Sequence, residues 1–185
     1  GKTTTWKFNA AGPVRTIAVS GSNIYVGGSF YSICGSIRNH IAALDATTGM
    51  PTSWDPDVDD MVRAIAVEGS NIYIGGDFNN IGGQTRNYIA AIDATTGNVT
   101  SWNPNSNNVV RTLAVSGANV YAGGDFTSVG GQTRNRIAAI DATTGNVTSW
   151  DPNSNNVVRT LAVSGSNVYA GGDFTSIGGQ TRNRI

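Results

Sequence analysis

The chain has 185 residues, only 13% of them charged, and its twelve basic and twelve acidic side chains give a formal net charge of zero. This balance gives no electrostatic case for binding nucleic acid or an anionic membrane surface. No apolar run approaches the roughly 20 residues that a membrane-spanning helix requires, so we expect no membrane insertion.

The dominant feature of the sequence is a repeat with a period of 48 residues. A fixed period of roughly 20–50 residues is typical of repeat architectures and outweighs any local motif. Three sets of residues keep this period: the tryptophans Trp6, Trp54, Trp102 and Trp150; the Val-Arg pairs at 14–15, 62–63, 110–111 and 158–159; and the Gly-Gly pairs at 27–28, 75–76, 123–124 and 171–172.

The first half of each repeat predicts a β-hairpin, and the copy that starts at Val110 is the clearest. Its apolar run 110–115 predicts a strand, and 120–126 predicts a second strand. The intervening Ser-Gly-Ala-Asn predicts the hairpin turn, because Gly and Asn tolerate the positive φ of such turns. The Gly pair at 123–124 indicates a bulge or the close approach of a neighbouring backbone.

The second half of the same repeat predicts two further strands. Residues 127–135 are expected to form a loop and 136–141 a third strand. The Ala-Thr-Thr-Gly segment 142–145 predicts a turn, with Gly in the left-handed conformation. Residues 146–150 then predict a short fourth strand, and 151–156 lead into the next copy.

These elements predict an all-β fold, a β-propeller made of 48-residue, four-stranded antiparallel blades, with four repeat units in the chain. No segment has the i, i+3, i+4 apolar spacing of a helical solenoid. A β-helix is the weaker competitor. We expect a single propeller domain, or part of a larger propeller. Its units are approximately 1–13 as a closing strand, 14–61, 62–109, 110–157 and an incomplete 158–185.

Two arrangements of the repeats are consistent with the phase of the chain ends. The strand Lys2–Trp6 would complete the last blade of a four-bladed ring. Alternatively, the chain is part of a larger ring completed by more sequence or by a second chain. The copies 110–137 and 158–185 are nearly identical, which favours the larger assembly. The absence of an initiating methionine indicates a removed leader or an excerpt of a longer protein.

The segment Gly-Gly-Asp-Phe-Thr-Ser-Val-Gly-Gly-Gln-Thr-Arg-Asn-Arg-Ile-Ala-Ala at 123–139 resembles the delta-60 repeat β-propeller family of bacterial proteins. This resemblance covers essentially the whole chain and implies an extracellular or cell-surface propeller. A looser similarity, through Ala-Leu-Asp-Ala-Thr-Thr-Gly at 43–49 and Trp54, is to the blades of quinoprotein dehydrogenases. Trp54 lies one residue later than in that motif, so the similarity indicates shared blade packing and no quinone cofactor.

Several candidate residues recur once per repeat and are interpreted first as structural. Exposed tryptophans would stack on sugars, but one Trp per repeat at a fixed phase favours packing between blades, with the indole N–H bonded to backbone. A ring of Arg and Asp at the channel would bind an ion, or its members would pair with one another. These series are Arg15, Arg63, Arg111 and Arg159, and Asp77, Asp125 and Asp173, with Ser29 replacing Asp in the first copy.

The sharpest metal-site candidate is the loop Asp55-Pro-Asp57-Val-Asp59-Asp60. Alternating carboxylates on a loop can converge on Ca²⁺, which takes six to eight oxygen ligands. Asx-Pro-Asx is equally an ordinary turn sequence, and the Gly and distal Glu of an EF-hand are absent. Calcium is therefore the one candidate cofactor, and no other cofactor is expected.

The sequence does not predict an enzyme. Cys34 and His40 are the only Cys and His, and the other repeats carry different residues at both positions. The leading hypothesis is a non-enzymatic, extracellular or cell-surface scaffold for protein binding or self-assembly. The alternative is a carbohydrate- or calcium-dependent adhesin that uses the loop face. An adhesin requires open aromatic or acidic pockets, whereas a scaffold requires buried tryptophans.

Overall fold

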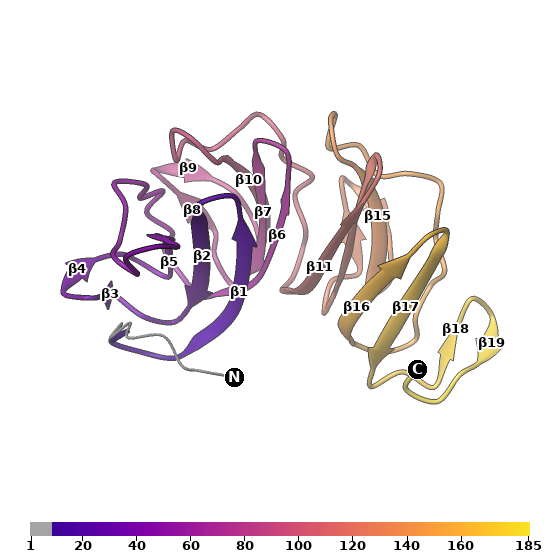
Figure 1. Cartoon of the computed structure of the whole chain (residues 1–185). Coiled ribbons are helices and arrows are strands. Elements are labelled where there is room, and N and C mark those ends of the chain that lie inside the picture. Colours follow the sequence, from indigo (N-terminus) through magenta and orange to yellow (C-terminus); the bar gives the residue numbers. More distant parts are fainter. Residues whose placement is uncertain (1–8) are drawn as a thin grey trace.

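A computed structural model describes residues 9–185 as an all-β arrangement of repeated sheets (Figure 1). The predicted closing strand, with Trp6, lies outside the described residues. Within 9–185, no helix is long and apolar enough to cross a membrane. The prediction of an all-β repeat protein is therefore confirmed at the level of fold class.

Four antiparallel sheets follow one another along the described chain, and we call them units 1 to 4. Unit 1 is β1 (Val14–Ser20), β2 (Asn23–Gly28) and β5 (Ile41–Asp45). Unit 2 is β6 (Val62–Glu68), β7 (Asn71–Gly76) and β10 (Ile89–Asp93). Unit 3 is β11 (Val110–Ser116), β12 (Asn119–Gly124) and β15 (Ile137–Asp141). Unit 4 is β16 (Val158–Ser164) and β17 (Asn167–Gly172).

Each unit begins with the predicted hairpin. In unit 3, Ser116 pairs with Asn119 across a two-residue turn, and Gly117 takes a φ of 57° there. The register shifts between Val110 and Thr112, so the ladder contains a bulge. A Cβ on Gly124 would lie 2.2 Å from the carbonyl oxygen of Val109. The second Gly of each pair is therefore needed because the backbone beside the bulge leaves no room for a side chain.

The expected loop between the second and third strands is not featureless. It contains a two-stranded hairpin in every repeat, and the first strand of each hairpin carries a buried or half-buried aliphatic residue. These hairpins are β3 (Ser32–Ile33) with β4 (Ser36–Ile37), β8 (Asn80–Ile81) with β9 (Gln84–Thr85), β13 (Ser128–Val129) with β14 (Gln132–Thr133), and β18 (Ser176–Ile177) with β19 (Gln180–Thr181).

The expected fourth strand is reduced to a single bridge. In unit 3, Ile140 bridges Val147, and the backbone N–H of Thr148 donates to the carbonyl of Ala139 at 2.9 Å. The chain then turns, because Thr148 Oγ1 accepts a hydrogen bond from the N–H of Trp150 at 3.3 Å. The segment leaves the ladder so that its tryptophan reaches the neighbouring unit.

The hydrophobic core lies between successive units. The first strands pack side by side, β1 against β6, β6 against β11, and β11 against β16. Three core clusters each draw on two successive units, and one of these joins Tyr25 and Ile41 of unit 1 to Ile72 and Phe78 of unit 2. A fourth cluster, with Val26, lies within unit 1. Within residues 9–185, β16 does not pack against β1 in this way, so the row of units is open (Figure 1).

Candidate functional site

A tryptophan lies at each junction between units. The ring of Trp54 meets Tyr25 of unit 1 edge-on, with 5.3 Å between ring centroids. Its Nε1 donates to the carbonyl of Asp93 in unit 2 at 3.0 Å. Trp102 repeats this arrangement at the next junction, 5.0 Å from Tyr73 and with its Nε1 2.9 Å from the carbonyl of Asp141.

The burial of these indoles decides how they can act. Trp54 is 5% exposed and Trp102 is 4% exposed. Neither ring offers an open face to a sugar, so both act in packing between units. Trp150 is half-buried and meets Tyr121 edge-on at 5.4 Å. Trp6 was predicted to act in the same way, but it lies outside the described residues.

A Gly-Val contact accompanies the tryptophan at each junction. A Cβ on Gly75 of unit 2 would lie 2.6 Å from Val110 Cγ1 of unit 3. The same separation is 2.7 Å for Gly27 against Val62 and also for Gly123 against Val158. In units 1 to 3, the first Gly of the Gly-Gly pair therefore leaves the space that a valine of the following unit fills.

The outer face of unit 4 has neither partner among the described residues. Tyr169, which corresponds to Tyr25 and Tyr73, is 54% exposed. Gly171 has no valine against it; its nearest atoms are Thr160 Cγ2 at 2.9 Å and the carbonyl oxygen of Arg184 at 3.7 Å. An apolar groove of about 210 Å³ lies on this face, lined by Tyr169, Gly171, Ile185 and four other residues.

The outer face of unit 1 shows the complementary feature. Ile17 is 57% exposed and Val19 is 69% exposed. The residues that correspond to Ile17 in the later units are packed against the preceding unit and are each only 9% exposed: Ile65, Leu113 and Leu161. The two outer faces of the described chain are thus the two unfilled halves of its internal junction.

The second recurring feature is an arginine-aspartate pair in units 2 to 4. Arg63 donates to Asp77 through Nε at 2.8 Å and Nη2 at 2.7 Å. Arg111 makes the same bidentate pair with Asp125 at 3.0 and 2.6 Å. Arg159 makes it with Asp173 at 2.9 and 2.5 Å.

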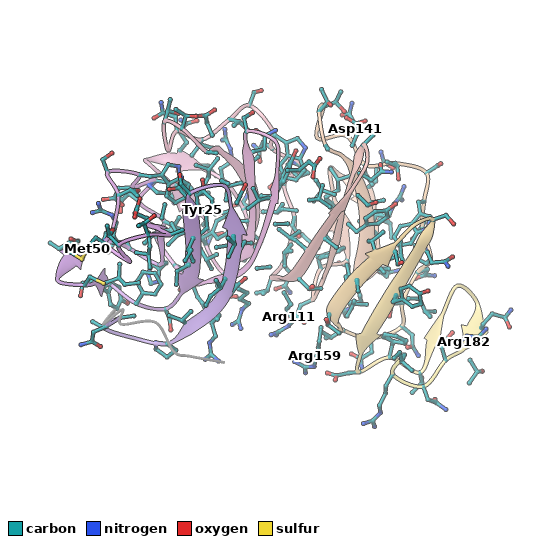
Figure 2. All side chains as sticks on the ribbon, viewed as in Figure 1. Tyr25, Met50, Arg111, Asp141, Arg159 and Arg182 are labelled. Carbon is teal, nitrogen blue, oxygen red and sulfur yellow. The ribbon has the colours of Figure 1, made fainter. Side chains whose placement is uncertain are left out.

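These pairs shift the acidity of their members. The hydrogen bonds that Arg63 donates to Asp77 raise the pKa of the Arg63 guanidinium. The hydrogen bonds from Arg159 lower the pKa of Asp173, and the charge of Arg111 in the preceding unit lowers it further. The Arg-Asp pairs of adjacent units therefore interact electrostatically. In Figure 2, Arg111 and Arg159 lie near each other at one end of their strands, far from Asp141.

The four arginines at the second position of the first strands line one cavity of about 190 Å³. Arg15 differs from the others because position 29 holds serine. The N–H of Ser29 bonds to the carbonyl of Pro13 at 2.9 Å, as the N–H of Asp77 bonds to that of Met61. Serine therefore occupies the backbone position of the aspartate without its charge, and Arg15 is exposed and has no ion pair with any described residue.

The four predicted calcium ligands of the acidic loop are held by different partners. Asp55 forms an ion pair with Arg38 at 3.3 Å. Asp57 accepts from Asn39 Nδ2 at 2.8 Å. Asp59 accepts from the N–H of Asn79 at 2.9 Å, and Asp60 accepts from the N–H of Met61 at 2.6 Å.

This loop has the same turn geometry in the other repeats. Asp57 has a φ of 55°, and Asn105 and Asn153 have φ of 54° and 49° at the same phase. Asn107 corresponds to Asp59, and its Oδ1 accepts from the N–H of Thr127 at 2.9 Å. Among residues 9–185, no three His, Cys, Asp or Glu side chains come together as a metal site would require. Calcium binding by this loop remains a prediction without geometric support.

Cys34 and His40 have separate partners. Cys34 Sγ lies 3.9 Å from the carbonyl of Gly49. His40 is 4% exposed, packs edge-on against Tyr31 with ring centroids 5.0 Å apart, and has a buried Nδ1 without a hydrogen bond. This arrangement has no nucleophile-base contact.

One set of strained residues could not be predicted from the sequence. The residue before each third strand has a positive φ, although it is not glycine: 63° at His40, 62° at Tyr88 and 67° at Arg136. Arg184, at the same phase of unit 4, has a φ of 73°. The N–H and carbonyl of each residue are both held; the N–H of Arg136 donates to the carbonyl of Phe126 at 2.8 Å, and its carbonyl accepts from the N–H of Gly124 at 2.9 Å. These tertiary bonds fix the conformation, and nothing in the residue types signals it.

Repeated sheets with their core between successive units define a protein of the β-propeller repeat class. The comparisons with known proteins agree with this assignment to the β-propeller repeat class. Residues 2–151 match the family described as "Outer membrane protein assembly factor BamB". The match covers more than half of the chain, so the chain belongs to this family of propeller repeats.

Two solved structures of computationally designed proteins resemble the chain. The Ika4 protein has a TM-score of 0.62 and 18% sequence identity, over 88% of this chain and 87% of that one. The Ika8 protein has a TM-score of 0.50 and 14% identity, over 89% of this chain and 57% of that one. This chain spans little more than half the length of Ika8. At these identities the likeness concerns the fold alone. No curated protein sequence matches the chain.

Proposed function

We propose that this chain is a non-enzymatic propeller scaffold that self-assembles, with units 1 to 4 acting as blades. Two copies join head to tail, the outer face of unit 4 in each copy receiving the outer face of unit 1 of the other. The single observation that carries this proposal is the exposure, at the two ends, of the surfaces that form all three internal junctions.

The complementarity of these faces supports the proposal. Tyr169 and Gly171 on unit 4 correspond to residues that hold a tryptophan and a valine inside the chain. Unit 1 offers Val14, Ile17 and Val19 in the same phase as the residues that fill the internal junctions. Adjacent exposed apolar residues on a soluble protein mark a contact surface. Since the two faces differ, the contact is heterologous.

The number of copies follows from closure. A heterologous contact gives a ring if the rotation closes and a fibre if it does not. Propellers typically have about 4–8 blades. Two copies of four blades reach the upper end of this range, whereas three copies exceed it. A closed pair also leaves no end face exposed to water.

The burial of Trp54 and Trp102 supports the scaffold over the adhesin, because a sugar-stacking site needs open indoles. The family's description, an outer membrane protein assembly factor, supports a role in binding protein at a cell envelope. We keep the extracellular or cell-surface location, the bacterial source and a delta-60 type of repeat as parts of the proposal.

A complementation experiment tests the assembly. Ile17→Asp places a charge on the apolar unit 1 face, and Tyr169→Asp places one on the unit 4 face. Both residues are more than half exposed, so each single variant is expected to fold. Either variant alone should be monomeric by sedimentation velocity, because each copy lacks one half of every junction. Mixed together, they should form a dimer with one intact junction.

The control is Ile37→Asp. Ile37 is 75% exposed in β4, and the corresponding Thr85 and Thr133 of the inner units are exposed too, so this position lies outside the junctions. This variant should associate like the unaltered chain. Dimerisation of both single variants on their own, or failure of the mixture to associate while the unaltered chain does, would overturn the head-to-tail arrangement.

A further inference from the structure

The arginines at the second position of the first strands form a belt with an excess of positive charge. Four guanidinium groups line the cavity, and three carboxylates pair with them. One positive charge therefore remains, and it belongs to Arg15 because Ser29 replaces the aspartate. Residues 1–8 contain no acidic side chain that could supply the missing partner.

The belt also has unused hydrogen-bond donors. Each paired arginine uses Nε and Nη2 for its aspartate. Its Nη1 has no hydrogen-bond partner among the described residues. A guanidinium has five N–H donors in a planar fork, and oxyanions are its natural acceptors. Three partly used forks and one free fork therefore line the same small cavity.

We propose that this cavity binds a small tetrahedral oxyanion such as inorganic phosphate. Arg15 supplies the uncompensated charge and a bidentate contact, and the free Nη1 groups of Arg63, Arg111 and Arg159 contribute further donors. Charge-assisted bidentate contacts of this kind are the strong class of hydrogen bond.

The composition of the cavity selects this ligand class. A cation is disfavoured because all three carboxylates are held by their own arginines. A volume of about 190 Å³ is smaller than the roughly 300–1,000 Å³ typical of pockets for drug-sized ligands. Four arginine side chains on one small cavity match the several acceptor oxygens of a compact anion better than a planar or extended ligand.

Isothermal titration calorimetry with inorganic phosphate tests the site, with arginine Hε resonances followed by NMR on the same sample. Melting temperature is not used, because phosphate and sulfate stabilise proteins generally through exclusion from their surface. We expect saturable binding of one phosphate per chain, with a shift of the Arg15 Hε signal. Sulfate should compete, whereas acetate at equal concentration should compete at least ten times more weakly.

Two variants locate the binding. Arg15→Gln removes the free charge, and Ser29→Asp restores the fourth ion pair without removing the arginine; each should weaken phosphate binding at least tenfold. Arg182→Gln is the matched control, because Arg182 is an exposed arginine outside the belt and its loss should leave the affinity unchanged. The proposal is overturned by no saturable binding to the unaltered chain, by unchanged binding to Ser29→Asp, or by an equal loss in Arg182→Gln.

Discussion

At the scale of single residues, the indoles of Trp54 and Trp102 each combine two interactions. Each ring packs against a tyrosine of one unit, and each N–H bonds to a backbone carbonyl of the next. Trp102 has both interactions and is 4% exposed. Trp150 has the ring contact but is half-buried, and its Nε1 has no hydrogen-bond partner among the described residues.

We therefore expect Trp102→Ala to lower the free energy of unfolding by about 3–5 kcal/mol, as is usual for buried aromatic residues. Trp150→Ala should cost clearly less. Urea denaturation followed by circular dichroism measures both changes. Equal losses at the two positions would contradict the assignment of Trp102 as a buried, hydrogen-bonded junction residue.

The aspartate that ends each third strand is a second stabilising residue. Asp93 Oδ1 accepts from the N–H of Thr96 at 2.7 Å, from Thr96 Oγ1 at 2.8 Å and from the N–H of Thr95 at 3.0 Å. The backbone hydrogen bond from Thr96, followed by that from its hydroxyl, lowers the pKa of Asp93 below the usual 3.8. Asp45 and Asp141 are held in the same way.

This geometry predicts a pH dependence. Because the pKa is lower in the folded state, the charged aspartate stabilises the fold above the unfolded pKa, and this contribution is lost as the pH falls through the folded pKa. The unaltered chain should exceed Asp93→Asn in urea midpoint at roughly pH 5, and the difference should shrink toward roughly pH 2. A difference in urea midpoint that stays constant over this range would show that the charge of Asp93 does not contribute to the stability of the fold.

At the scale of elements, the following unit limits the space for a side chain at the Gly-Gly end of the second strand in units 1 to 3. Gly123→Ala would bring a Cβ to 2.7 Å from Val158 and 2.8 Å from Thr112. Overpacking of this kind typically costs about 1–3 kcal/mol. Gly171→Ala meets only Thr160 within 3.0 Å, at 2.9 Å from its Cγ2.

We expect Gly123→Ala to lower the free energy of unfolding and Gly171→Ala to leave the isolated chain nearly as stable. In the proposed assembly, however, Gly171→Ala should weaken association, since Val14 of the second copy would lie against it. Denaturation and sedimentation measured on both variants separate these effects. A Gly171→Ala chain that associates normally would contradict the use of this face.

The predictability of the elements follows their range of interaction. The repeat, the first hairpin and the turns could be predicted because they depend on local residue types and on a spacing of 48. The reduction of the fourth strand could not, because it depends on where Trp150 must reach. The positive φ of Arg136 is equally invisible, since it is imposed by bonds to Phe126 and Gly124 that lie far along the chain.

The candidate site was predictable only in part. The Arg and Asp series and the exception at Ser29 could be named from the sequence, as could the alternatives of ion binding and mutual pairing. The pairing of each Arg with the Asp 14 residues later depends on the register of the hairpin and its bulge. Calcium binding by the acidic loop stays a prediction, because turn geometry uses the same Asx residues that a calcium site does.

At the scale of the whole molecule, the open row of units is the feature that matters most. Every internal junction packs a Trp, a Val and an aliphatic residue between two sheets, whereas the ends leave Ile17, Val19 and Tyr169 exposed. Hydrophobic burial is roughly proportional to the apolar area removed from water. Joining the ends therefore gains the same kind of stabilisation as each internal junction, at the cost of bringing two chains together.

The mass of the particle in solution tests this account most directly. Light scattering coupled to size-exclusion chromatography, over a series of protein concentrations, measures it for the unaltered chain. We predict a particle of twice the 19.2 kDa of one chain, dissociating on dilution. A particle of 19.2 kDa at every concentration would contradict the proposed assembly.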